Sequence, residues 1–305
     1  MTHVLRQGSD AALGFITATG LVAPLIPSTT GSTFFVHSGT GNSGNSGLNP
    51  ANALATVDQG INKCTANKGD VVVVMPGHAE NIASATALVP DIAGVTIVGL
   101  GRGRNRPVLT FTNTAGKIAI TGANTRISNI VMIASVSAVV TGISVEADDV
   151  ELDNLYMGFD ETGDDFAIMI LVSAKDRLMV RNSMFVAENT AGCNAGIQFV
   201  DALDTQIWHN VFEGDYTTAV LNGVTTLSTG VFVVGNVMRN SDTTAGVLLT
   251  TVASSTGLAA YNSGGTLYST NITAPWANTG LLSIQNFVVN VVTETAGITP
   301  ATAST

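Results

Sequence analysis

The chain has 305 residues, of which 45% are hydrophobic and only 11% are charged, and its formal net charge is −10. Globular proteins usually contain about 25% charged residues, and an acidic balance argues against nucleic acid as a partner. No apolar run approaches the ~20 residues of a membrane-spanning helix, so we also expect no membrane partner. The start lacks the basic and apolar order of a signal peptide, which predicts that the protein is made in a cytosol and not exported by that route.

The first 33 residues predict an arm. They mix Gly, Pro and Thr with apolar patches ("GFITATGLVAPLIP") and show no clear period. We expect this arm to attach the protein to a partner and to order there, because it lies outside the repeated part of the chain. The alternative is that it folds back over its own solenoid or a sister subunit. The candidate attachment residues are Phe15, Ile16, Leu21, Val22, Leu25 and Ile26.

Residues 34–70 predict a strand, a loop and a capping helix. "TFFVHS" is typical of a strand, and "GTGNSGNSGLNP" is dense in turn formers. A helix near 51–66 is indicated by apolar residues at helical spacing, which would cover the open end of a core. These residues are Leu54, Val57, Ile61 and Cys64. "GDVVVVMPG" then predicts a strongly apolar strand.

Residues 71–293 predict a solenoid of short strands. An asparagine recurs at steps of 24 to 28 residues after an alternating segment: Asn129, Asn154, Asn182, Asn210, Asn236, Asn262 and Asn286. A second apolar element precedes each asparagine by 11 to 16 residues: Ile118, Ile143, Ile168, Ile197, Val220 and Val247. Such a repeat predicts an all-β fold, a right-handed parallel β-helix of about nine coils. Residues 294–305 are small and polar and predict a tail.

The seven asparagines have two possible roles at the bends of this solenoid. An inward Asn can donate to and accept from the Asn of the next coil, which forms a ladder along the core. Alternatively, each Asn tolerates the left-handed backbone conformation that a bend requires. Both roles are compatible with the same fold.

The block "FFVHSGTGNSGNSGLNPANALATVDQGINKCTANKGDVVVVMPGHAE" resembles the opening of pectin-lyase-like β-helix proteins. With "DIAGVTIVGLGRGRNRPVL" and "TRISNIVM", residues 33–290 resemble a family of β-helix proteins from tailed-phage and prophage genomes. The resemblance implies a virion structural protein with no known catalytic residues. We expect a homotrimer on the head surface, a capsid decoration or cement protein bound to the major capsid protein or another virion protein. A head or tail fibre comes next, and the rival class is a tailspike-like protein that binds or cleaves surface polysaccharide.

Two long segments, 11–57 and 243–293, contain no Asp, Glu, Lys or Arg. Exposed surface normally carries mixed charge. Either these segments form a neutral surface rich in Thr, Ser and Asn, or other chains cover them. We adopt the second interpretation, in which Thr266 and Thr270 are exposed positions of a subunit interface.

Residues that would support catalysis are few. The motifs that polygalacturonase-like β-helix enzymes share are missing, although Asp148 and Asp149 form an Asp-Asp pair. A lyase needs a basic residue above a Ca²⁺-bound uronate, for which Arg177 and Arg181 are the nearest candidates. Only two tryptophans, Trp208 and Trp276, are available as sugar platforms. We therefore expect no enzymatic activity and no cofactor.

The segment 146–165 holds nine acids and no base. Alternation predicts that Glu151 and Asp153 point outward, and four further acids fall on a loop: Asp160, Glu161, Asp164 and Asp165. A solvated face is the favoured interpretation. A Ca²⁺ site and a glycosidase carboxylate pair are the alternatives.

The remaining candidates are isolated side chains. Arg102, Arg104 and Arg106 form the one basic cluster, which is either solvated or paired with acids of a neighbouring subunit. His78 has no second ligand nearby, and His209 is expected to point outward from a strand. Cys64 and Cys193 fit no metal or redox spacing and are expected to be unpaired.

Overall fold

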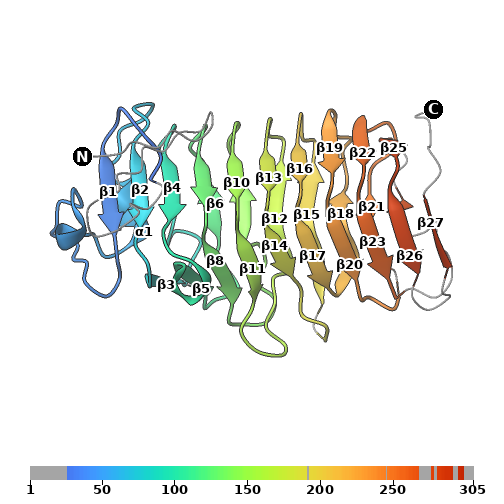
Figure 1. Ribbon diagram of the computed structural model, residues 1–305, viewed down its shortest axis with the longest axis horizontal. Helices are drawn as coiled ribbons and strands as arrows, with labels where there is room; N and C mark the ends of the chain where they lie inside the picture. The colour runs from blue at the N-terminus through green and yellow to red at the C-terminus, as the bar shows by residue number, and fades with distance from the viewer. Residues whose placement is uncertain are drawn as a thin grey trace, which may run out of the picture.

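The computed structural model describes residues 26–190, 192–244, 246–267, 276–277, 280–290 and 295–298. The chain forms an all-β, right-handed parallel β-helix of about eight turns, elongated from β1 at one end to β27 at the other (Figure 1). Three sheets of ten, ten and seven strands make its sides. The predicted fold class is therefore confirmed. The turn count is slightly below the nine expected, because the first and last turns do not contribute to all three sheets.

Each sheet contains one strand from successive turns. Sheet I consists of β1 (Thr33–Val36), β2 (Val71–Val74), β4 (Thr96–Gly99), β7 (Arg126–Ser128), β10 (Glu151–Asp153), β13 (Met179–Arg181), β16 (Gln206–Trp208), β19 (Val231–Val234), β22 (Gly257–Ala260) and β25 (Leu282–Ile284). Sheet II consists of β3 (Ala79–Ile82), β5 (Val108–Phe111), β8 (Val131–Ala134), β11 (Tyr156–Phe159), β14 (Met184–Val186), β17 (Val211–Gly214), β20 (Val237–Asn240), β23 (Ser263–Thr266), β26 (Phe287–Asn290) and β27 (Thr295–Ile298). Sheet III consists of β6 (Ile118–Ile120), β9 (Ile143–Val145), β12 (Ile168–Ser173), β15 (Cys193–Val200), β18 (Tyr216–Gly223), β21 (Leu249–Thr250) and β24 (Trp276–Ala277).

A single hydrophobic core runs through the solenoid, because inward side chains lie in register from turn to turn. Leu152 pairs with Val180 and Val180 with Ile207, and all three are buried. The Phe185 and Phe212 rings stack at 4.7 Å between centroids in adjacent turns. Such an aromatic pair adds about 0.5–1.5 kcal/mol beyond its buried area.

The N-terminal end of the core is covered by the helix α1 (Val57–Ile61), which is shorter than the helix expected over 51–66. The backbone of Leu54 donates to the carbonyl of Phe35 (2.8 Å) and so extends alongside β1, which excludes it from the helix. Two short 3₁₀ turns, η1 (Pro50–Asn52) and η2 (Gly103–Asn105), lie in loops. Thr56 and Gln59 form a capping box at the start of α1. The expected apolar face is buried: Leu54, Val57 and Ile61 all join the core.

Polar side chains fix this first turn. Asp70 accepts from the backbone N–H groups of Ser32 and Thr65, both at 2.6 Å. The buried His78 accepts from the backbone of Ser38 through Nδ1 (3.0 Å), which leaves Nε2 to donate to Glu80 (3.0 Å). The Gly-Asp and Pro-Gly-His motifs are thus structural in this protein.

The C-terminal edge of sheet II is covered by β27, which pairs antiparallel with β26. This strand lies inside the segment 294–305 that the sequence analysis treats as a tail. Pairing there matters because an open sheet edge exposes unpaired backbone groups. Among the described residues, no helix is both long and apolar enough to cross a bilayer.

Candidate functional site

The structure divides the seven repeat asparagines between two adjacent positions of the bend from sheet I to sheet II. The first position has a positive φ or a glycine in seven successive turns: Asn129, Asn154, Asn182, His209, Gly235, Tyr261 and Gln285. The second position is buried: Ile130, Leu155, Ser183, Asn210, Asn236, Asn262 and Asn286. Both roles that the sequence left open therefore occur, in different turns.

Four asparagines form an inward ladder. The side-chain amide of Asn236 donates to Oδ1 of Asn262 (2.9 Å) and to the carbonyl of Ile207 (2.8 Å). Its own Oδ1 accepts from the backbone and the side chain of Asn210, at 2.9 and 3.1 Å. Asn262 repeats this arrangement with Asn286. Because each amide replaces its lost water contacts with these bonds, the buried polar groups carry little net cost.

Asn129, Asn154 and Asn182 are not part of the inward ladder, which corrects the expectation of one ladder of seven. Their φ values of 58°, 53° and 52° place them in the left-handed region. Asn154 donates to Oδ1 of Asn129 (3.0 Å) on the outside, and Asn182 donates to Asp153 (3.0 Å). The two bend positions differ by one residue, which a repeat of variable length could not resolve.

Ile26 is the one candidate attachment residue within the described part of the chain. It packs against Val71, Val73 and Val98 on the outer face of sheet I. This contact agrees with the alternative in which the arm folds back over its own solenoid. The other five candidates lie outside the described residues: Phe15, Ile16, Leu21, Val22 and Leu25.

The middle of sheet I carries a charge network on its outer face. Glu151 and Asp153 point outward as predicted, and each lies between two arginines from the adjacent turns. Arg181 reaches Glu151 at 2.6 Å, and Arg126 reaches Asp153 at 2.8 Å. The second lyase candidate, Arg177, pairs with Asp149 at 2.5 Å. Both arginines proposed for lyase chemistry are thus engaged by acids of the same chain.

A row of carboxylates occupies the corner between sheets II and III: Asp165, Glu188, Asp215 and Asp242. Asp165 is only 2% exposed, so it does not belong to the solvated loop expected for residues 160–165. One of its oxygens accepts from the backbone of Phe166 (2.7 Å). Burial, together with the nearby Glu188 and Asp215, raises the pKa of Asp165 to about 7. Within the described ranges, no group of three or more His, Cys, Asp or Glu is arranged to hold a metal ion.

The basic loop is partly tied to the solenoid. The Arg106 guanidinium donates to the carbonyls of Ile130 (3.0 Å) and Asn154 (2.5 Å), and its half-burial lowers its pKa. Arg102 and Arg104 are exposed. Both cysteines are free: Cys193 is buried and Cys64 is half-buried.

Sheet II carries apolar side chains on its outer face as well as in the core. At the first outward position of its strands lie Val108, Val131, Tyr156, Met184, Val211, Val237 and Phe287, with Ser263 alone polar. Ile133, Val186 and Val289 continue this surface at the second position. We call these residues the outer face of sheet II.

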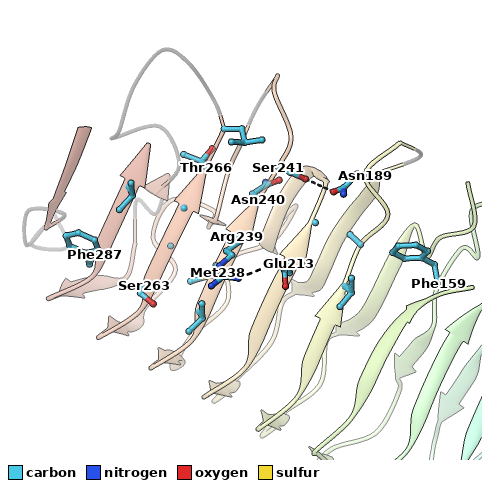
Figure 2. Close-up of a pocket in the computed structure, with 18 residues that line it drawn as sticks. Phe159, Asn189, Glu213, Met238, Arg239, Asn240, Ser241, Ser263, Thr266 and Phe287 are labelled. Atoms are coloured by element: carbon cyan, nitrogen blue, oxygen red, sulfur yellow. Dashed lines mark hydrogen bonds and ion pairs between the residues drawn. The ribbon is translucent and has the colours of Figure 1, made fainter. Parts of the chain in front are cut away.

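A hollow of about 680 Å³ lies over the C-terminal half of this face. Figure 2 shows its extent between Phe159 and Phe287, with the hydrogen bond from Ser241 to Asn189 (2.9 Å) along one wall. Gly264 and Gly265 contribute no side chains to the floor. Thr266 also lines the hollow but is 1% exposed, which corrects its expected exposure; Thr270 lies outside the described residues.

The chemistry of the hollow is that of a binding surface. Glu213 is the one carboxylate among its lining residues, and it pairs with Arg239 at 3.4 Å. Glycoside cleavage requires two carboxyl groups ~5–10 Å apart across the substrate. The lining supplies one acid, so it lacks that pair.

No family model and no curated protein sequence matches this chain. Among solved structures, it is similar to a rhamnogalacturonan lyase, with 12% identity over 85% of this chain and 74% of the lyase and a TM-score of 0.53. Likeness at this identity establishes the fold alone.

Two further similarities are weaker. One is to ORF18 of Geobacillus virus E2, with 14% identity over 77% of this chain and 57% of that one and a TM-score of 0.32. The other is to a GH136 lacto-N-biosidase from Eubacterium ramulus, with 11% identity over 85% of this chain and 68% of that one and a TM-score of 0.28. Neither score supports an argument.

Proposed function

We propose that this protein is a structural component of a tailed-bacteriophage virion, a homotrimeric capsid decoration or cement protein that acts by adhesion. Its partners are then further copies of itself and the major capsid protein or another virion protein, and it assembles in the host cytoplasm. The sequence blocks shared with phage β-helix proteins support the viral source. The surface of the C-terminal turns supports adhesion.

That surface is the observation on which the proposal depends. The described residues include ten exposed large hydrophobic side chains, and seven of them follow residue 200: Leu203, Leu227, Phe232, Tyr261, Leu267, Leu282 and Phe287. Charged residues are absent over 243–293 in the same region. Exposed apolar groups that lack charged neighbours are typical of surfaces that partners cover. Repeated at many equivalent sites on a shell, modest contacts add to strong attachment.

The alternative function is a fibre or tailspike-like protein that binds or cleaves surface polysaccharide. The hollow on sheet II favours binding, because polar side chains such as Asn189 and Ser241 stand beside apolar ones there. Incubation with host capsular polysaccharide and with polygalacturonate, with and without Ca²⁺, distinguishes the two. New reducing ends or unsaturated products would establish the enzyme, and we expect neither.

Particle binding tests the adhesive function directly. The full-length protein should bind phage heads stripped of this component and raise their resistance to heat or chelator. A variant that begins at Ser32 should remain a β-helix by circular dichroism yet bind such heads more weakly, if the arm provides attachment. Full-length protein that does not bind stripped heads would contradict the proposal.

A further inference from the structure

We propose that the outer face of sheet II is buried between copies of this chain. The inference rests on the proposed function, in that it takes up the self-association and assigns it a surface. It adds residues and a geometry that the uncharged C-terminal segment alone did not supply, since the face extends from β5 to β26.

The apolar character of this face is continuous. Seven of the eight strands from β5 to β26 place an aliphatic or aromatic side chain at the first outward position, and Met184 and Phe287 remain 38% and 45% exposed. Parallel strands that are apolar on both faces occur where both faces of a sheet are covered. The face is also flat, because the Tyr156 ring lies across Gly158, where a Cβ would come within 2.9 Å of the ring.

The charges on the face favour a second copy as the occupant. Glu213 and Arg239 are the charged residues of strands β5 to β26 in sheet II, and they lie one turn apart at 3.4 Å. A partner with the same face can offer a base to the acid and an acid to the base. A strongly acidic or strongly basic partner would match one of them and oppose the other.

The area is sufficient for association. Eight strands at about 4.8 Å spacing, each with about four residues of ~3.3 Å rise, form a strip of roughly 35 by 13 Å. Two copies would cover roughly 900 Å² of this strip, before the corner loops are counted, which approaches the ~1,000 Å² of a specific interface. Protruding Phe287 and the hollow above Gly264 and Gly265 give the same face a knob and a recess.

Light scattering on the full-length protein tests the inference at micromolar concentration. The double variant Met184→Arg, Phe287→Arg should associate at least tenfold more weakly and run as a monomer, with an unchanged circular dichroism spectrum. The matched control Leu203→Arg, Leu227→Arg changes side chains of similar exposure, 38% and 40%, at a corner away from sheet II, and should keep the wild-type mass. A wild-type monomer, or a sheet II variant that keeps the wild-type mass, would overturn the inference.

A charge exchange gives a second measurement that does not depend on a folding defect. Glu213→Arg should weaken association, and addition of Arg239→Glu should restore it, because the exchanged pair is again complementary. Restoration by the double exchange supports the inference, and a single variant that associates like the wild type opposes it. Wild-type protein that associates but does not bind stripped heads would contradict the virion function while leaving this interface in place.

Discussion

At the scale of single residues, the bend between sheets I and II separates two demands on the side chain. The first bend position needs a residue that tolerates a left-handed backbone, which Asn and Gly do at little cost. The second needs a side chain that either packs in the core or satisfies its own hydrogen bonds there. Asn154 and Asn236 answer these two demands respectively, although each follows a similar alternating segment.

Replacement of an inward asparagine should be costly. We expect Asn236→Ala to lower the free energy of unfolding by ~1–3 kcal/mol, because the backbone and side-chain donors of Asn210 lose their acceptor in the core. The matched control Asn182→Gly keeps the left-handed bend at an exposed site and should change it by less than ~0.5 kcal/mol. Equal losses in urea unfolding would remove the distinction between the two positions.

The buried Asp165 predicts a pH dependence. Its pKa rises from 3.8 in the unfolded chain to about 7 in the fold, so the folded state binds more protons between these values. Stability from this group is therefore present below about pH 4 and is lost as the pH rises toward 7.

The variant Asp165→Asn isolates this contribution. It should melt higher than the wild type at pH 8, because a buried charge is removed, and this advantage should shrink toward pH 5. Asp160→Asn, at an exposed position of the same loop, should follow the wild type at both values. A difference between wild type and Asp165→Asn that stays constant with pH would contradict the assigned pKa.

At the scale of elements, α1 shows how closely the cap fits the first turn. Gly60 faces the sheet, and a Cβ there would lie 2.8 Å from Cγ1 of Val72 and 2.9 Å from Cγ2 of Val36. Helix propensity alone would favour alanine over glycine by about 1 kcal/mol. Packing opposes it, since valine side chains are stiff and have little room to move.

We therefore expect Gly60→Ala to destabilise the protein by ~1–3 kcal/mol, against its helix propensity. Asn62→Ala, at the exposed end of the same helix, serves as the control and should cost less than ~1 kcal/mol. Thermal unfolding followed by circular dichroism measures both. An increase in melting temperature for Gly60→Ala would show that the helix can shift away from the sheet.

At the scale of the whole molecule, the solenoid differs from side to side and from end to end. Sheet I is charged in the middle, through Arg126 and its neighbours, whereas sheet II is apolar on the outside along most of its length. The N-terminal end is capped by α1 and by residues around Ile26, and the C-terminal edge of sheet II is paired with β27.

Removal of the arm should therefore affect stability as well as attachment. A variant that begins at Ser32 uncovers Val71, Val73 and Val98, and we expect it to lose ~1–3 kcal/mol, the value of one large apolar contact. Ile26→Ala in the full-length chain should reproduce most of this loss. Truncation without any change in urea midpoint would show that Ile26 contributes nothing to the folded state.

The sequence by itself determined the solenoid, its repeat length and the buried face of the capping helix. These depend on the local alternation of apolar residues and on turn formers, which are visible within one turn of about 26 residues. Only the tertiary structure decided which asparagines point inward, because bends of adjacent turns align through strand register and not through equal spacing. It alone joined Arg126 to Asp153 and placed Asp165 beside Glu188, since stacking brings together residues more than twenty positions apart. The apolar outer face of sheet II emerged for the same reason: one outward valine in a short strand carries no signal, but eight stacked strands form a surface.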